Sequence, residues 1–233
     1  MASCKALNSF LQGNIALFQQ DIKQVEDVNE ILEDGDTLLH HAVIGRNAFV
    51  TQLIINYKGD LSIRDSFGRY PLHFAVQSGH LPTVQLVIKQ TDESHFDVRD
   101  KNGWNVFHYA AALDKKDVIQ HLLKLDSSKI SSITKDKRTL LHIAASNGNV
   151  AICQFLISQQ CPIDKLDSSG CTCLHYAASN GHSDTITLLI NNGVDPNIRS
   201  SSRQTALDIA NDNNHTKCIS ILEKAISESV CFI

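Results

Sequence analysis

Five residues in the second half of the chain, Cys171-Thr172-Cys173-Leu174-His175, combine two thiols with an imidazole. Thiolates and imidazoles are preferred ligands of Zn²⁺ in proteins, so this segment raises the question of a metal site. A structural zinc site, however, usually joins a C-x₂-C pair to a second, distant pair of ligands, and a fourth ligand is missing here. We therefore expect no metal ion and no other cofactor.

Histidines could also serve catalysis, because an imidazole exchanges protons near neutral pH. Of the eleven histidines, five recur in similar local sequence with spacings of 33, 35, 34 and 33 residues: His40, His73, His108, His142 and His175. A catalytic histidine would not recur five times in one pattern, so we interpret these histidines as structural. The sequence also lacks a Gly-rich phosphate loop, an H-E-x-x-H motif and a nucleophile elbow, and we expect no enzymatic activity.

The same spacing extends to both ends of the chain. One step beyond His175 reaches Asp208 in TALDIA, and one step before His40 reaches Leu7 in KALNSF. Seven repeat units are thus predicted, and the atypical or polar residues of the first and last suit capping units. We expect a single domain over residues 1–233, with an N-terminal capping unit (1–32), five central repeats (33–199), a C-terminal capping unit (200–226) and a tail (227–233).

Each unit has the signals of two short helices and a turn. A threonine stands three residues before the repeated position, where its hydroxyl can cap a helix: Thr37, Thr139, Thr172 and Thr205. A glycine such as Gly148 ends that helix, and a second apolar stretch and an Asp/Asn/Gly turn segment follow. None of these units could bury its apolar face alone, so the units must stack.

This pattern resembles the ankyrin repeat, most closely over residues 167–197 (DSSGCTCLHYAASNGHSDTITLLINNGVDPN). The resemblance implies an all-α ankyrin-repeat solenoid of stacked helix-turn-helix units with β-hairpin loops. It also implies that Thr139 and His142 hydrogen-bond to each other and to the backbone of adjacent turns. Tyr70 and Asn105 replace the threonine, so we expect weaker capping in their units.

The resemblance further implies a non-catalytic protein-protein interaction module, a scaffold or adaptor that binds its partner on the concave face made by hairpin tips and first helices. Carried over to this sequence, the binding positions that stand out are Phe67, Arg69, Lys101, Trp104, Leu113, Lys135 and Arg138. Tryptophan and arginine often dominate interface energies. In the alternative interpretation, Trp104 packs on the next hairpin and the basic side chains are simply solvated.

Two narrower resemblances give alternative functions. The seven-unit size is similar to gankyrin-type chaperones of proteasome assembly, which bind a regulatory-particle ATPase. The segments GDTLLH, GWNVFH and KRTLLHIAA resemble an ankyrin-repeat cofactor of alanyl-tRNA synthetase. The protein would then be an assembly chaperone or a regulatory cofactor of one enzyme. The irregular loops at residues 90–100 and 126–137 are further candidates for partner contacts.

Composition excludes some other classes of partner. A net charge of −4 and a pI near 6.2 argue against nucleic-acid binding, and no apolar run approaches the ~20 residues of a membrane helix. The N-terminus lacks a secretory signal, and Cys231 in the final VCFI stands one position too late for prenylation. Seven cysteines read as free thiols in a reducing compartment. We expect a monomer in the cytoplasm, or also the nucleus, whose partner is a protein.

Overall fold

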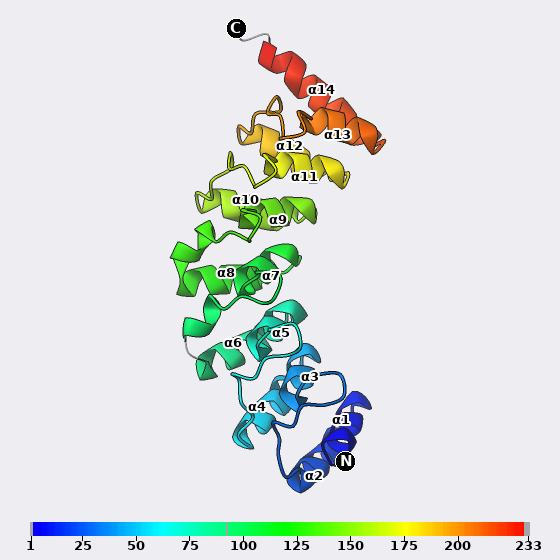
Figure 1. Ribbon diagram of the computed structural model, residues 1–233, viewed down its shortest axis with the longest axis vertical. Helices are drawn as coiled ribbons and strands as arrows, with labels where there is room; N and C mark the ends of the chain where they lie inside the picture. The colour runs from blue at the N-terminus through cyan, green and yellow to red at the C-terminus, as the bar shows by residue number, and fades with distance from the viewer. Residues whose placement is uncertain (1, 92, 231–233) are drawn as a thin grey trace. The chain divides into compact units, whose positions relative to one another are not determined.

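The computed structural model describes residues 2–91 and 93–230, and its α-helices there fall into seven consecutive pairs, one for each predicted unit (Figure 1). The pairs are α1 (Ala2–Leu11) and α2 (Ile15–Asp21), α3 (Leu38–Ile44) and α4 (Ala48–Asn56), α5 (Pro71–Ser78) and α6 (Leu81–Gln90), α7 (Val106–Ala112) and α8 (Lys116–Leu125), α9 (Leu140–Ser146) and α10 (Val150–Ser158), α11 (Cys173–Ser179) and α12 (Ser183–Asn191), and α13 (Ala206–Asp212) and α14 (Thr216–Val230). Three 3₁₀ helices lie between them: η1 (Ile22–Gln24), η2 (Glu93–Phe96) and η3 (Ser127–Ser131). The predicted all-α repeat fold is confirmed.

The loops between helix pairs are tight turns closed by backbone hydrogen bonds. In the turn before α5, for example, the N–H of Asp65 donates to the carbonyl of Arg69 at 3.0 Å. Across the described residues these loops form no β-strand and only one isolated bridge, between Ile133 and Thr139. The expected hairpins therefore exist as turns without an extended ladder.

One position of this turn requires a left-handed backbone. Gly68 has a φ of 80° there. The equivalent residue in two other repeats is not glycine but Lys137 (φ 61°) or Arg203 (φ 63°). A β-carbon is strained in this region, whereas glycine is not. The turn before α9 thus keeps its shape although it lacks the turn glycine.

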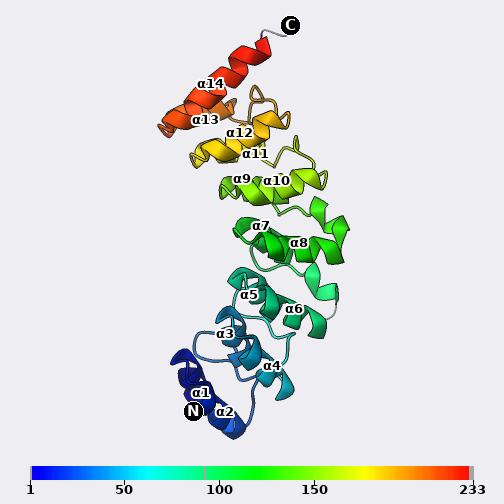
Figure 2. The same ribbon diagram turned by 180° about the vertical axis from the view of Figure 1, so that it is seen from behind.

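The chain divides into two compact units, residues 1–109 and 110–233. Within the first unit, α3 packs against α1 and α5, and α4 packs against α6. Within the second, the first helices form one row (α9, α11, α13) and the second helices another (α10, α12, α14), as Figures 1 and 2 show. The single domain over residues 1–233 stays a prediction.

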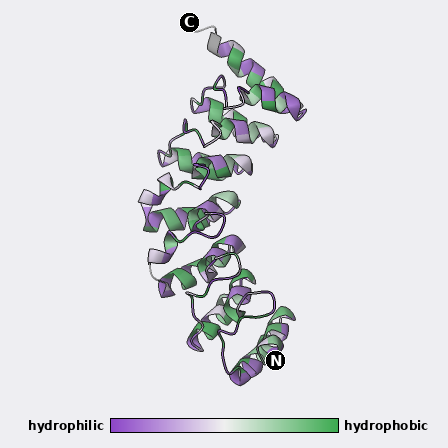
Figure 3. Cartoon of the chain, in the orientation of Figure 1, coloured by the Kyte–Doolittle hydropathy of each residue, from purple (hydrophilic) through white to green (hydrophobic). Residues whose placement is uncertain are grey.

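The core of each compact unit is made by its first and second helices together. In six of the seven repeats an alanine follows two residues after the repeated position, and all six alanines are fully buried: Ala42, Ala75, Ala110, Ala144, Ala177 and Ala210. Their small side chains let neighbouring first helices approach closely, and larger residues such as Leu72 and Ile152 are buried as well. Figure 3 shows hydrophobic residues along the helices and mainly hydrophilic residues in the connecting loops.

The helix ends largely follow the predicted signals. Thr139 caps α9, since its hydroxyl accepts a hydrogen bond from the backbone N–H of His142. Asn105 caps α7 as well, because its side-chain oxygen accepts from the N–H groups of Phe107 and His108. Helix α14 continues to Val230 and so includes residues 227–230, which the sequence pattern had assigned to a tail.

Within the described part of the chain, no helix is long and apolar enough to span a membrane. The described cysteines are free thiols: Cys4, Cys153, Cys161, Cys171, Cys173 and Cys218. Cys231 lies outside the described residues.

Candidate functional site

The buried imidazole of His142 uses both ring nitrogens. Its Nδ1 accepts from the backbone N–H of Thr139 (3.2 Å) and from the Thr139 hydroxyl (2.8 Å). Its Nε2 lies 3.1 Å from the carbonyl oxygen of Cys171, to which it donates in the tautomer that these contacts require. Burial lowers the pKa of His142, so the ring stays neutral at physiological pH. This geometry supports a structural role.

The other repeated histidines make similar contacts with different partners. His175 bridges to the carbonyl of Gln204 (3.2 Å) and His73 to that of Val98 (3.1 Å). His40 pairs with Thr37, but its Nε2 lies near the backbone of Arg69 without a well-formed hydrogen bond in the described residues. Burial lowers the pKa of His40 to about 4. His108 accepts from the N–H of Asn105 at 3.1 Å.

A second set of bonds ties repeats together at the start of the second helices. The Nε2 atoms of His182 and His215 each lie 3.1 Å from a carbonyl oxygen of the preceding repeat, in Ser146 and Ser179. Gly148 makes room for this contact, because a β-carbon there would stand 2.6 Å from the ring of His182. Both histidines therefore serve in packing between neighbouring repeats.

Phe67 and Arg69 occupy the hairpin tip before α5, where the buried carboxylate of Asp65 holds the turn. Asp65 accepts from the backbone N–H groups of Phe67 (2.9 Å) and Arg69 (2.7 Å), and from the guanidinium of Arg69 at 2.6–2.7 Å. The guanidinium also lies over the ring of Phe67, 5.2 Å from its centre. The Phe67 side chain is nonetheless 56% exposed, so a rigid turn presents an aromatic ring beside a fixed cation.

Lys101 and Trp104 lie on the next hairpin of the same unit. The N–H of Lys101 donates to the carbonyl of Phe67 (2.9 Å), which joins the two hairpin tips. The ring of Trp104 packs edge-on against Tyr109 at 5.4 Å and is half-buried. The hydroxyl of Tyr109 donates to the carboxylate of Asp100 (2.8 Å), and burial raises the pKa of Tyr109 to about 12. Trp104 is thus supported by its own repeat and keeps part of its surface accessible.

The remaining predicted residues belong to the second unit. Leu113 is half-buried after the end of α7, and the side chain of Lys135 is exposed at a hairpin tip. The guanidinium of Arg138 lies over the ring of Tyr176 (4.6 Å), with Nε 3.9 Å from the carboxylate of Asp167. In each compact unit, therefore, one predicted arginine lies over an aromatic ring: Arg69 over Phe67 and Arg138 over Tyr176.

The comparisons with known proteins agree with this geometry. The sequence profile of ankyrin repeats (3 copies) matches residues 4–97, 39–133, 92–167 and 141–229. The chain belongs to the ankyrin-repeat family. The ankyrin-repeat domain of human ASB11 superposes with a TM-score of 0.81 at 19% identity and covers 94% of this chain and 96% of its own. For the ankyrin-repeat domain of Bcl-3, the TM-score is 0.71 at 20% identity, with 94% and 97% covered.

Curated ankyrin-repeat relatives match only part of the chain. Rabankyrin-5 of Homo sapiens is 30% identical over 129 residues, which is 55% of this chain and 11% of that protein. The probable 26S proteasome regulatory subunit p28 of Saccharomyces cerevisiae is 33% identical over 125 residues, which covers 51% of this chain and 54% of that protein. The matched region thus spans about a tenth of the first relative's length and about half of the second's.

The thiol segment of this ankyrin repeat does not have the geometry of a zinc site. Both ring nitrogens of His175 are already in hydrogen bonds, to Thr172 and to Gln204. Cys173 is fully buried with its sulfur 3.5 Å from the carbonyl of Ile163, and burial raises the pKa of its thiol. Zn²⁺ binds thiolates and free imidazole nitrogens, so a buried, protonated thiol and an imidazole with both nitrogens hydrogen-bonded are unsuitable ligands.

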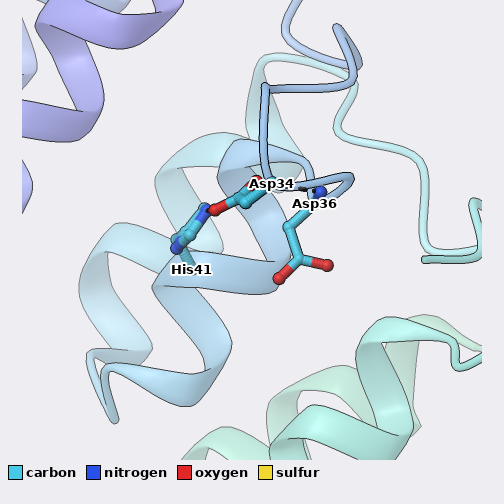
Figure 4. Close-up of side chains that lie close together, drawn as sticks. All are labelled: Asp34, Asp36 and His41. Carbon is cyan, nitrogen blue, oxygen red and sulfur yellow. Dashed lines mark hydrogen bonds and ion pairs between the residues drawn. The ribbon is translucent and has the colours of Figure 1, made fainter. Parts of the chain in front are cut away.

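A group of potential metal ligands lies at the first hairpin, where the repeat pattern gives no sign of it. Asp34, Asp36 and His41 place one potential ligand atom each within 4.8 Å of one another. Figure 4 shows His41 and Asp34 pointing toward each other, with their Nε2 and Oδ2 atoms 2.9 Å apart. Three ligands are one short of a closed zinc site, and the contact between His41 and Asp34 accounts for their closeness.

Proposed function

We propose that the protein is a non-catalytic adaptor that binds an acidic surface of a partner protein on the concave face of its ankyrin array. Ankyrin repeats are protein-protein interaction modules, and scaffolds of this fold are typically non-catalytic. The observation that carries the proposal is the exposed ring of Phe67, held beside Arg69 at a rigid hairpin tip. Because Asp65 already fixes this turn, binding costs little conformational entropy there.

The other predicted residues have complementary roles in this proposal. Trp104 presents the accessible part of its ring beside the exposed Lys101 in the first unit. Leu113, Lys135 and Arg138 supply apolar and basic contacts in the second unit. The histidines at the repeated position hold the turns in place and do not touch the partner. Basic side chains speed the encounter with an acidic partner, and this effect weakens as salt screens it.

Two phenylalanines of equal exposure allow a matched test. Phe67 at the hairpin tip and Phe49 on α4 are both 56% exposed in the first unit. Wild type, Phe67→Ala and Phe49→Ala are immobilised, and the proteins captured from cell lysate are compared by quantitative mass spectrometry. We expect a partner that binds wild type and Phe49→Ala and is depleted at least tenfold on Phe67→Ala. A partner depleted by Phe49→Ala instead would contradict the proposal.

A second candidate function is that of an assembly chaperone or regulatory cofactor of one enzyme. The match to the probable proteasome regulatory subunit p28 favours the proteasome type, whereas the synthetase type rests on the sequence segments alone. Co-purification of tagged protein with proteasome ATPases, but not with the assembled 26S particle, would support chaperone activity. Capture of other partners alone would leave the adaptor function as the better account.

A further inference from the structure

The second unit has an apolar groove beside the irregular loop that precedes α9. The groove has a volume of about 310 Å³, and its apolar walls come from Ile133, Pro162 and Leu166. The side chains of Ile133 and Leu166 are 42% and 48% exposed, and they line the same groove from neighbouring repeats. Such a volume accommodates one or two aliphatic side chains of a ligand, near the lower end for small binding pockets.

Basic side chains flank this apolar floor. Lys137 and Lys165 both line the groove and are exposed, and neither has an ion-pair partner within residues 2–91 and 93–230. Residues 129–138 contain four basic side chains and one acidic side chain, in a chain whose net charge is −4. Lys129 and Arg138 of this segment face the carboxylates of Asp126 and Asp167, so Lys137 and Lys165 supply the positive charge at the groove itself. The groove therefore complements a ligand with negative charge on either side of an aliphatic group.

Lys137, with a φ of 61°, occupies the turn position that is glycine in most other repeats. A lysine in this conformation is strained, while glycine would fit without strain, as Gly68 does at the equivalent position. The side chain at this strained position borders the groove. Arg203 has the same conformation at the equivalent turn position and does not line the groove, so the two residues form a matched pair.

We propose that this groove binds an acidic peptide segment of a partner protein, with a leucine, isoleucine or valine inserted between Ile133 and Leu166. Aspartate or glutamate residues on either side of that anchor contact Lys137 and Lys165. A nucleic acid would also meet the basic charge, but none of the described residues that line the groove has an aromatic ring on which a base could stack. This surface goes beyond the proposed contacts, because none of its lining residues is assigned to the partner there, although Lys137 shares a turn with Lys135 and Arg138.

The test is a display library of eight-residue peptides panned against the full chain. We expect the enriched sequences to contain one aliphatic residue flanked by Asp or Glu. The most enriched peptide is then synthesised with a fluorescent label, and its affinity is measured by anisotropy. Leu166→Asp should weaken binding at least tenfold, because it places a carboxylate in the aliphatic pocket. A twelve-nucleotide single-stranded RNA should not displace the peptide.

Lys137→Gly separates a binding role from a structural one, and Arg203→Gly is its matched control. Both variants remove strain at the same turn position, so each should raise the melting temperature by about 1–4 °C. Only Lys137→Gly should lower the affinity for the peptide, by about threefold or more. Failure to enrich acidic-aliphatic peptides, equal binding by Leu166→Asp, displacement by the RNA, or unchanged affinity of Lys137→Gly would overturn the proposal.

Discussion

The repeats of the two units are held together by different bonds. In residues 110–230, the histidine of one repeat bonds a turn carbonyl of the next, as in His142 with Cys171 and His175 with Gln204. A second row of bonds runs back to the preceding repeat from Asn149, His182 and His215. In residues 2–91 and 93–109 this regularity is lost, because His73 reaches Val98 and His40 lacks a well-formed Nε2 bond there.

The difference shows where the sequence has kept the stacking pattern and where it has departed from it. The stability of a repeat array is roughly the sum of repeat and interface terms, so identical bonds in successive repeats add up. In the first unit, other groups form some of the bonds between repeats. The guanidinium of Arg46, for example, donates to the carbonyl of Ser78 in the next repeat at 2.6–2.8 Å. The same unit carries the exposed ring of Phe67. We expect binding to depend most on the irregular unit and stability on the regular one.

The largest effect on binding is expected in the irregular unit. Trp104→Ala should cost about 2 kcal/mol or more of binding free energy once a partner is identified, the range of an interface hot spot. Because Trp104 also packs on Tyr109, the comparison must use the folded fraction of each variant. Titration calorimetry measures the affinity. Wild-type affinity in a folded Trp104→Ala variant would make the irregular loops the better binding candidates.

The largest effect on stability is expected in the regular unit. His142→Ala should lower the free energy of unfolding by about 1–3 kcal/mol, because it leaves the carbonyl of Cys171 without its donor and α9 without part of its cap. His40→Ala should cost less, since its Nε2 bond is poorly formed. Urea denaturation followed by circular dichroism measures both. If His142→Ala were fully stable but no longer bound a partner, the structural interpretation would be wrong.

Protonation of buried histidines should weaken both units. Burial lowers the folded-state pKa of His40 to about 4, and it lowers those of His73, His142 and His175 as well. The unfolded chain binds these protons near pH 6.5, so stability is fully present above that pH and falls as the pH drops toward 4. Urea midpoints at pH 7.5, 6 and 5 should therefore decrease. His40→Ala should show a shallower decrease than wild type.

A smaller effect separates two histidines at the same position of different repeats. His182 reaches the carbonyl of Ser146, whereas His80 contacts the hydroxyl of Thr83 within its own repeat at 2.8 Å. His182→Ala should therefore cost about 1 kcal/mol of unfolding free energy, and His80→Ala should cost less. Equal losses would show that the bond between repeats adds nothing to the regular unit.

No effect is expected from a metal chelator. Because the nitrogens of His175 are occupied and the thiol of Cys173 is buried, EDTA should leave the melting temperature unchanged. Elemental analysis of the purified protein should find no stoichiometric zinc. One zinc per chain that disappears in Cys171→Ser would contradict this prediction and would place a metal centre in the regular unit.

Much of the fold could be predicted because it is encoded in short, repeated signals. The spacing of the histidines located the seven helix pairs, and Thr139 and its equivalents marked the helix starts. The pattern could not show that Asn105 caps α7 with its side chain, since this depends on the rotamer it adopts. Nor could it show that Trp104 packs against Tyr109, or that Ile133 and Leu166 line one groove. Those contacts depend on how residues that are not repeat signals pack in three dimensions.

Photo-crosslinking at two positions of the first unit tests the central claim most directly. The photoreactive amino acid p-benzoylphenylalanine replaces either Phe67 at the hairpin tip or Phe49 on α4, two side chains of equal exposure. After irradiation in cells, the account predicts a discrete crosslinked species with a partner protein from position 67 and none from position 49. Crosslinking from position 49 alone would place the partner on the outer helices and contradict the account.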